Sequence, residues 1–128
     1  MAEGQNENSR NDKATEFQGG TVHLLETAIN DGDGDDELQT NSEASETTAD
    51  GDWSINHDNN AGTTTLENTS DIDFGAVSGF TVNQIVVQST DDPDNLLIDN
   101  DPQGDTDLSG DGDTSIEAND LTYTIGGE

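Results

Sequence analysis

Basic residues are almost absent from this sequence. Its 128 residues include 30 Asp and Glu but only 2 Lys and Arg, so the formal net charge is −28. Both cations, Arg10 and Lys13, lie near the start, and no Lys or Arg follows them. Ion pairs with Lys or Arg therefore cannot stabilise the rest of the chain, where the carboxylates mainly repel one another. Nucleic acid is not expected as a partner, because a phosphate backbone must be neutralised by cations.

Cysteine and long apolar runs are also missing. The absence of Cys excludes disulfides and thiolate metal sites. No apolar run exceeds three residues, so neither a membrane span nor a secretion signal is expected. Leu, Ile, Val and Phe make up only about 18% of the chain, and a share below about 20% with a large net charge is typical of disorder. Composition alone therefore leaves disorder and a folded domain equally open.

Concentrated salt would allow such a chain to fold. The distance over which charges act falls from about 8 Å at physiological ionic strength to about 3 Å at 1 M. Molar salt would thus screen the repulsion between carboxylates and allow a small apolar core to form. We infer a salt-loving source, and a haloarchaeon or its virus fits best.

Short clusters of alternating apolar residues, separated by turn residues, indicate a folded β domain. The clearest cluster spans residues 80–99 and predicts a hairpin: a strand over 80–87, a turn over 89–95 and a return strand over 96–98. The first strand should be central in its sheet, because it carries apolar residues on both faces. We expect one face to hold Phe80, Val82 and Val86, and the other Ile85 and Val87.

Six further strands follow from the same pattern, and no amphipathic helix is evident. They are expected at 21–28, 52–57, 63–66, 72–74, 114–118 and 121–125. About eight short strands at roughly ten-residue spacing indicate a sandwich or a small barrel. The predicted fold is an all-β antiparallel β-sandwich over residues 17–128.

The first sixteen residues form a separate, polar segment. Residues 3–13 contain no side chain able to anchor a core, so we expect an extended N-terminal arm over 1–16. A neighbouring subunit would hold this arm against its carboxylate-rich surface. Arg10, Lys13 and Phe17 are the predicted partner-binding residues.

Two acidic loops approach the spacing of a calcium-binding loop. Residues 31–35 have three alternating carboxylates but lack the turn glycine and the final Glu. Residues 105–113 keep the glycine in register, while Glu117 misses the last ligand position by one. The candidates for a weakly bound Ca²⁺ or Mg²⁺ are Asp105, Asp107, Asp111 and Asp113. Solvated loops that hold hydrated cations loosely are the simpler interpretation, so no cofactor is predicted.

No catalytic constellation is recognisable. His23 and His57 could act as acid or base beside the many carboxylates, but neither lies in a catalytic motif. Asn68 begins a glycosylation sequon, which a chain rich in Thr and Asn also produces by chance. The sequence predicts a protein that is not an enzyme.

Several segments follow one another in an informative order. The most specific is the ending, residues 112–125, read as Gly-Asp-Thr-Ser-Ile-Glu-Ala-Asn-Asp-Leu-Thr-Tyr-Thr-Ile. The earlier pieces are Val22–Thr27, Glu37-Leu38, Leu66–Phe74, and a central strand with Asn95–Leu97. This order resembles a family of small β-sandwich virion proteins of tailed viruses, described as tail-fibre-like, head-fibre or capsid-decoration proteins. The family usually begins with an amphipathic helix and often carries a Tyr-x-Arg after the acidic loop, and neither pattern is apparent here.

The resemblance implies a non-enzymatic structural protein of a haloarchaeal tailed virus. It would be assembled in the host cytoplasm and displayed on the outer capsid surface as a turret, head-fibre or decoration subunit. The expected partners are the major capsid protein or other virion proteins, and copies of the chain in a cyclic ring; no membrane is involved. The alternatives are a tail-fibre or receptor-binding module, and a secreted haloarchaeal carbohydrate-binding or hydrolytic β-sandwich.

Overall fold

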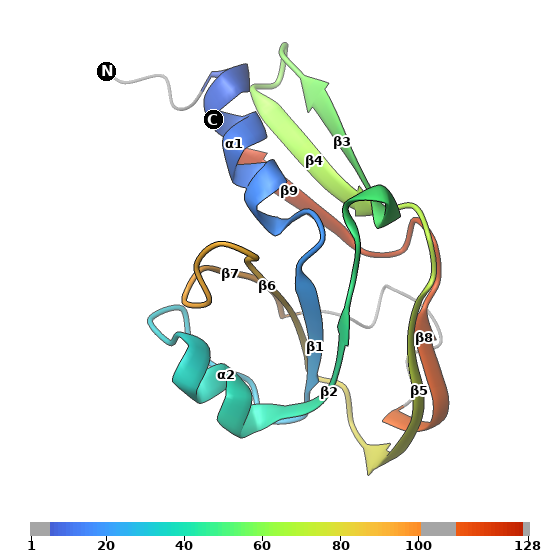
Figure 1. Cartoon of the computed structure of the whole chain (residues 1–128). Coiled ribbons are helices and arrows are strands. Elements are labelled where there is room, and N and C mark those ends of the chain that lie inside the picture. The colour runs from blue at the N-terminus through green and yellow to red at the C-terminus, as the bar shows by residue number, and fades with distance from the viewer. Residues whose placement is uncertain (1–5, 101–109, 127–128) are drawn as a thin grey trace.

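The structure is a computed structural model that describes residues 6–100 and 110–126, and it is mostly β, as predicted. Within these residues the chain forms nine strands and two α-helices, with α1 before β1 and α2 between β1 and β2 (Figure 1). The strands are β1 (Thr21–Leu25), β2 (Ser42–Thr47), β3 (Trp53–Asp58), β4 (Thr63–Asn68), β5 (Ile72–Phe80), β6 (Gln84–Gln88), β7 (Leu96–Asp99), β8 (Gly110–Ile116) and β9 (Thr122–Gly126). The helices are α1 (Glu7–Phe17) and α2 (Asp35–Asn41).

The strands form packed antiparallel sheets, which confirms the sandwich-like fold. One sheet has the order β2-β1-β6-β7 and a second has the order β3-β4-β9, while β5 pairs with β8. The main core joins these sheets, because Val22, Leu24 and Ile85 of the four-stranded sheet pack with Leu66 and Tyr123 of the other. The Tyr123 hydroxyl donates a hydrogen bond to the Ile85 carbonyl across this core, at 3.3 Å.

The predicted hairpin is present, and its first strand is central. β6 lies between β1 and β7, and all five of its residues are buried. Ile85 and Val87 face the main core, whereas Val86 packs into a second cluster on the outer face of the sheet. The predicted start at Phe80 is wrong, because Phe80 ends β5 and residues 81–83 break the alternation. Val82 therefore packs into the main core and not beside Val86.

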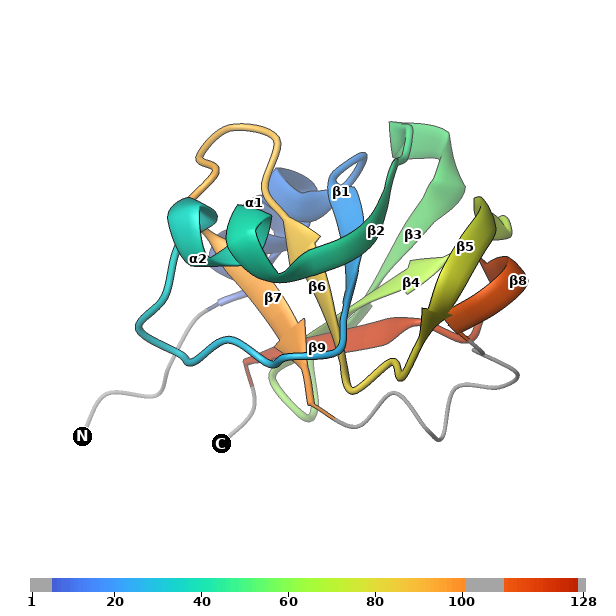
Figure 2. The same cartoon turned by 90° about the horizontal axis from the view of Figure 1, so that it is seen from below.

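The second cluster lies beneath α2, a helix that sequence patterning did not predict. α2 lies over the four-stranded sheet (Figure 2). Leu38 is the apolar residue of α2, and it packs with Leu25, Ile29 and Val86. The Glu37 side chain caps the N-terminus of α2, because its Oε1 accepts the Gly34 N–H at 2.8 Å. One apolar residue in seven gives no helical period, so α2 becomes visible only when a sheet supplies the surface that covers Leu38.

The expectation of an extended N-terminal arm is wrong for the described part of residues 1–16. Residues 7–17 form α1, which begins where the Asn6 side chain accepts the Ser9 N–H at 3.0 Å. The buried face of α1 consists of Arg10, Ala14 and Phe17, which are spaced by four and three residues. A helical spacing of buried residues is recognisable in the sequence only if Arg10 is counted among them. Without Arg10, Ala14 and Phe17 are too few to indicate a helix.

Candidate functional site

Arg10 anchors α1 to the fold and does not lie on the surface. Its side chain is only 3% exposed. Nε donates to Thr64 Oγ1 at 3.0 Å, and Nη2 donates to Asn59 Oδ1 at 2.9 Å. Asn59 in turn donates to Glu7 Oε1 at 3.0 Å. Arg10 and Glu7 of α1 therefore both bind the β3–β4 hairpin. The guanidinium thus serves as a core group of this chain.

Phe17 is likewise internal, at 3% exposure, and belongs to the main core. The interpretation of Arg10 and Phe17 as surface contacts for a neighbouring subunit is therefore corrected, because the chain's own sheets supply their partners. Lys13 is different, since its side chain is exposed and lines a groove. Of the three predicted partner residues, Lys13 remains placed for an external contact.

Arg10→Ala should loosen α1. Removal of the guanidinium leaves Thr64 and Asn59 without a charged donor, and buried hydrogen bonds to a charged group contribute about 1.5–3 kcal/mol. We expect the free energy of unfolding to fall by about 2 kcal/mol in urea titrations followed by circular dichroism. Lys13→Ala removes the same charge from the exposed side of α1 and should change it by less than about 0.5 kcal/mol. Equal losses in the two variants would show that α1 is held by charge alone.

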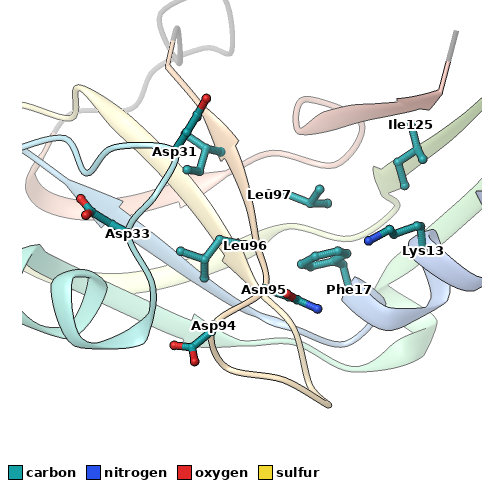
Figure 3. A pocket seen from close by; sticks show the side chains of 10 residues that line it. Lys13, Phe17, Asp31, Asp33, Asp94, Asn95, Leu96, Leu97 and Ile125 are labelled. Carbon is teal, nitrogen blue, oxygen red and sulfur yellow. The ribbon is translucent and has the colours of Figure 1, made fainter.

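The groove that Lys13 lines has a volume of about 380 Å³ and runs along β7 (Figure 3). Phe17 and Ile125 lie on one side of β7, next to Leu97. Leu96 lies on the other side, toward Asp31 and Asp33. Three successive residues of β7, from Leu96 to Ile98, are only half-buried, so the strand exposes apolar surface on both of its faces.

Opposite charges border the two sides of this groove. Lys13 stands beside Phe17 on the α1 side, and the carboxylates of Asp31, Asp33 and Asp94 stand on the other. Lys13 forms no ion pair within the part of the chain that the structure describes. The groove therefore combines an apolar floor with a mainly acidic rim, which suits a ligand that is apolar and carries positive charge.

The described parts of the two predicted cation-binding loops do not assemble a metal site. Asp105 and Asp107 lie outside the described residues, and Asp111 and Asp113 are exposed on β8. The prediction of a loop at residues 110–112 is wrong, because these residues belong to β8. In the first loop, Asp33 accepts the Asn30 N–H and Asp35 accepts from Gln39 and Gln88. Across residues 6–100 and 110–126, no three acidic or His side chains are grouped so as to hold a metal ion.

His23 is the centre of a buried polar network that sequence reasoning did not predict. Its Nε2 lies 3.2 Å from Gln88 Oε1, and its Nδ1 lies 2.8 Å from Ser42 Oγ. An amide oxygen only accepts, so Nε2 carries the proton and Nδ1 accepts from the Ser42 hydroxyl. Gln88 Nε2 continues the network to Asp35 Oδ1 at 2.6 Å. The network joins β1, β2, β6 and α2.

Burial lowers the pKa of His23 below its usual value, against the opposing effects of the Gln88 hydrogen bond and the Asp35 charge. The folded state therefore resists protonation of His23, whereas the unfolded chain takes up a proton near pH 6.5. The contribution of His23 to stability is constant above about pH 6.5. It declines as the pH falls below that value, by at most about 1.4 kcal/mol per pH unit.

Stability measurements on wild type and His23→Gln between pH 7.5 and 5.5 test this expectation. The wild type should lose more stability than the variant on acidification, because the variant has no imidazole to protonate. A His23→Gln profile parallel to that of the wild type would contradict the role assigned to burial.

Comparison with known protein families, with curated proteins and with solved structures finds no match for this chain. Fold and groove together define its class: a small, mostly β protein of packed antiparallel sheets with an acidic surface and an apolar groove at a sheet edge. In the portion of the chain that the structure describes, neither helix has the length and apolar character needed to cross a bilayer.

Proposed function

We propose that this protein is a non-enzymatic structural component of a haloarchaeal tailed virus, displayed on the outer capsid surface as a turret, head-fibre or decoration subunit. Copies would associate in a ring and attach to the major capsid protein or another virion protein. The proposal starts from the order of segments that the chain shares with small virion proteins, above all the ending at residues 112–125.

The helix α1 is the structural observation that supports this proposal most. The resembled family usually begins with an amphipathic helix, and the sequence pattern had indicated a polar arm instead. α1 occupies that place and buries Arg10, Ala14 and Phe17 against the sheets. The chain thus has a helix at that place, and its buried face includes the charged Arg10. The absence of a Tyr-x-Arg after the acidic loop remains, and there the chain forms α2 and the start of β2.

The distribution of carboxylates fits a role on an exposed particle surface. No Asp or Glu among residues 6–100 and 110–126 is buried. Most of these carboxylates therefore face solvent, where they would bind water and counter-ions in concentrated salt. Asp120 is an exception, because its Oδ2 atom is buried without a hydrogen-bond partner among the described residues. A surface of this kind repels identical surfaces, so particles covered with it would stay dispersed.

A tail-fibre or receptor-binding module is the alternative, and the aromatic residues disfavour it. Binding to a cell surface commonly uses exposed aromatic side chains. Phe17, Trp53 and Tyr123 are buried in this fold, and Phe74 and Phe80 are half-buried against the main core. No aromatic residue is thus offered to a ligand from a loop.

Immunogold labelling of virions from the source culture tests the location. An antibody raised against the recombinant chain should mark the capsid, and the copy number from quantitative mass spectrometry of virions should match a multiple of the capsid vertices or capsomers. Labelling confined to the tail tip would favour the receptor-binding alternative. Absence of the protein from purified virions would reject a structural role altogether.

A further inference from the structure

β7 differs from the edge strands β2 and β3 in what it exposes. The four-stranded sheet ends in β2 and β7, and the second sheet ends in β3 and β9. β2 carries the exposed carboxylates Glu43 and Glu46, and β3 exposes Asn56 and His57. Charged and polar side chains of this kind protect an edge from additional strands. β7 instead presents the apolar run from Leu96 to Ile98.

The backbone of β7 also points outward at two defined residues. Ser89 N–H donates to the Asn95 carbonyl at 3.0 Å, so these two residues form a hydrogen-bonded antiparallel pair. Along the same ladder Gln88 pairs with Leu96, Val87 with Leu97 and Val86 with Ile98. Hydrogen-bonded pairs alternate with non-bonded ones, which directs the backbone of Leu97 toward β6. The N–H and C=O groups of Leu96 and Ile98 therefore point away from the sheet.

The groove around this edge prescribes different side chains on the two faces of an added strand. Toward the interior, Leu97 lies beside Phe17 and Ile125, so apolar residues would be covered there. On the opposite face, Leu96 lies toward Asp31 and Asp33, and both Leu96 and Ile98 pack against the second cluster. Lys or Arg suits that face, because the aliphatic stem covers apolar surface while the charged end reaches a carboxylate.

We propose that β7 binds an extended segment of another protein in which apolar residues alternate with Lys or Arg, and that this segment extends the sheet by one strand. Backbone hydrogen bonds to Leu96 and Ile98 would supply affinity, and the two different faces of the groove would supply specificity. The inference concerns the chemistry of this edge and does not rest on the virion role.

A second copy of this chain is a poor occupant. Its cations are Arg10 and Lys13, and both lie on α1. Its strands contain no Lys or Arg, so strand pairing between copies would place carboxylates against Asp31, Asp33 and Asp94 without a cation on either strand. Charge complementarity therefore points to a partner of different sequence.

A capped, fluorescently labelled peptide of about seven residues in which Val alternates with Lys provides the probe. Its binding can be followed by fluorescence anisotropy, in the lowest KCl concentration at which the protein keeps its native circular dichroism. We expect saturable binding, and at least about tenfold weaker binding for the same peptide with Glu in place of Lys. On binding, hydrogen exchange at the amides of Leu96 and Ile98 should slow, while that of Leu97, already bonded to β6, should change little.

Variants at one position separate the backbone contact from the side chain. Ile98→Pro removes the outward N–H and blocks the edge without removing a bond to β6, so binding should weaken at least about tenfold. Ile98→Ala also loses the side chain but keeps the N–H, and its affinity should stay within about threefold of the wild type. A double Asp31→Asn, Asp33→Asn variant should bind the Lys peptide about fivefold more weakly.

Three results would overturn the proposal. They are equal binding of the Lys and Glu peptides, slowed exchange elsewhere but not at Leu96 and Ile98, and a dimer of the protein alone that Ile98→Pro dissociates. The last result would assign the edge to a second copy. The exchange measurement uses the unmodified protein, so it remains decisive even if Ile98→Pro fails to fold.

Discussion

Dilution from about 3 M to about 0.1 M KCl is expected to unfold this protein. With a net charge of −28, carboxylates that are screened within about 3 Å in molar salt repel one another over about 10 Å at 0.1 M. A core built from so few apolar residues cannot offset this repulsion, because total stabilities of domains are only about 5–15 kcal/mol. Trp53, the single tryptophan, is 4% exposed and donates from Nε1 to Thr48 Oγ1 at 2.8 Å. Its emission should shift to longer wavelength as strand circular dichroism is lost.

A variant with fewer charges separates charge repulsion from a general effect of salt. Glu43→Gln, Glu46→Gln, Asp91→Asn and Glu117→Gln change four exposed side chains that accept no hydrogen bond within the described residues. The KCl concentration at the midpoint of unfolding should fall in this variant, because less repulsion needs less screening. A native wild-type spectrum in about 0.1 M KCl would contradict the role that we assign to salt.

Asn68→Asp is expected to destabilise the fold more than Arg10→Ala does. Asn68 is fully buried at the end of β4. Its Nδ2 donates to the carbonyls of Ser70 and Glu117 at 3.1 and 2.9 Å, and its Oδ1 accepts the Leu121 N–H at 2.9 Å. An Asp of nearly the same shape would direct a carboxylate oxygen at two carbonyl oxygens inside the fold. We expect a loss of at least about 3 kcal/mol in the free energy of unfolding.

Asn56→Asp is the matched control for this substitution. It adds the same charge on exposed β3, so its effect should stay within about 0.5 kcal/mol of the wild type. Chemical denaturation of both variants in the same molar KCl compares them directly. Similar stabilities of the two variants would show that the contacts of Asn68 matter little. These contacts also leave no free amide nitrogen on Asn68, so the sequon does not present a glycan acceptor in the folded protein.

Strand patterning revealed most of the sheets but missed both helices. The 84–99 hairpin and the strands of the second sheet were predictable, because alternation between buried and exposed residues is a local property of a strand. α2 and β2 were not predictable, since their buried contacts amount to Leu38 and the partly buried Ala44. Segments with so few apolar residues take their structure from the surface on which they pack.

The groove along β7 could likewise be predicted only in part from the sequence. Leu96–Ile98 was recognisable as a strand, but the order β2-β1-β6-β7, which makes it an edge, involves residues distant in sequence. Of the three predicted partner-binding residues, Lys13 is exposed, whereas Arg10 and Phe17 are buried within the chain itself. Neither assignment could be improved locally, because Thr64 and Asn59, the partners of Arg10, lie about fifty residues further along the chain.

The sequence by itself determined the chemistry of the surface and the class of the fold. A chain with two cations and thirty carboxylates must keep most of its carboxylates at the surface, and its short alternating clusters can bury apolar surface only as sheets. Tertiary structure alone decided that Arg10 is buried in the core, that the buried Asn68 side chain bonds to Ser70, Glu117 and Leu121, and that the apolar strand β7 lies at the edge of its sheet. Each of these outcomes depends on pairing between distant segments, which sets hydrogen-bond partners and burial together.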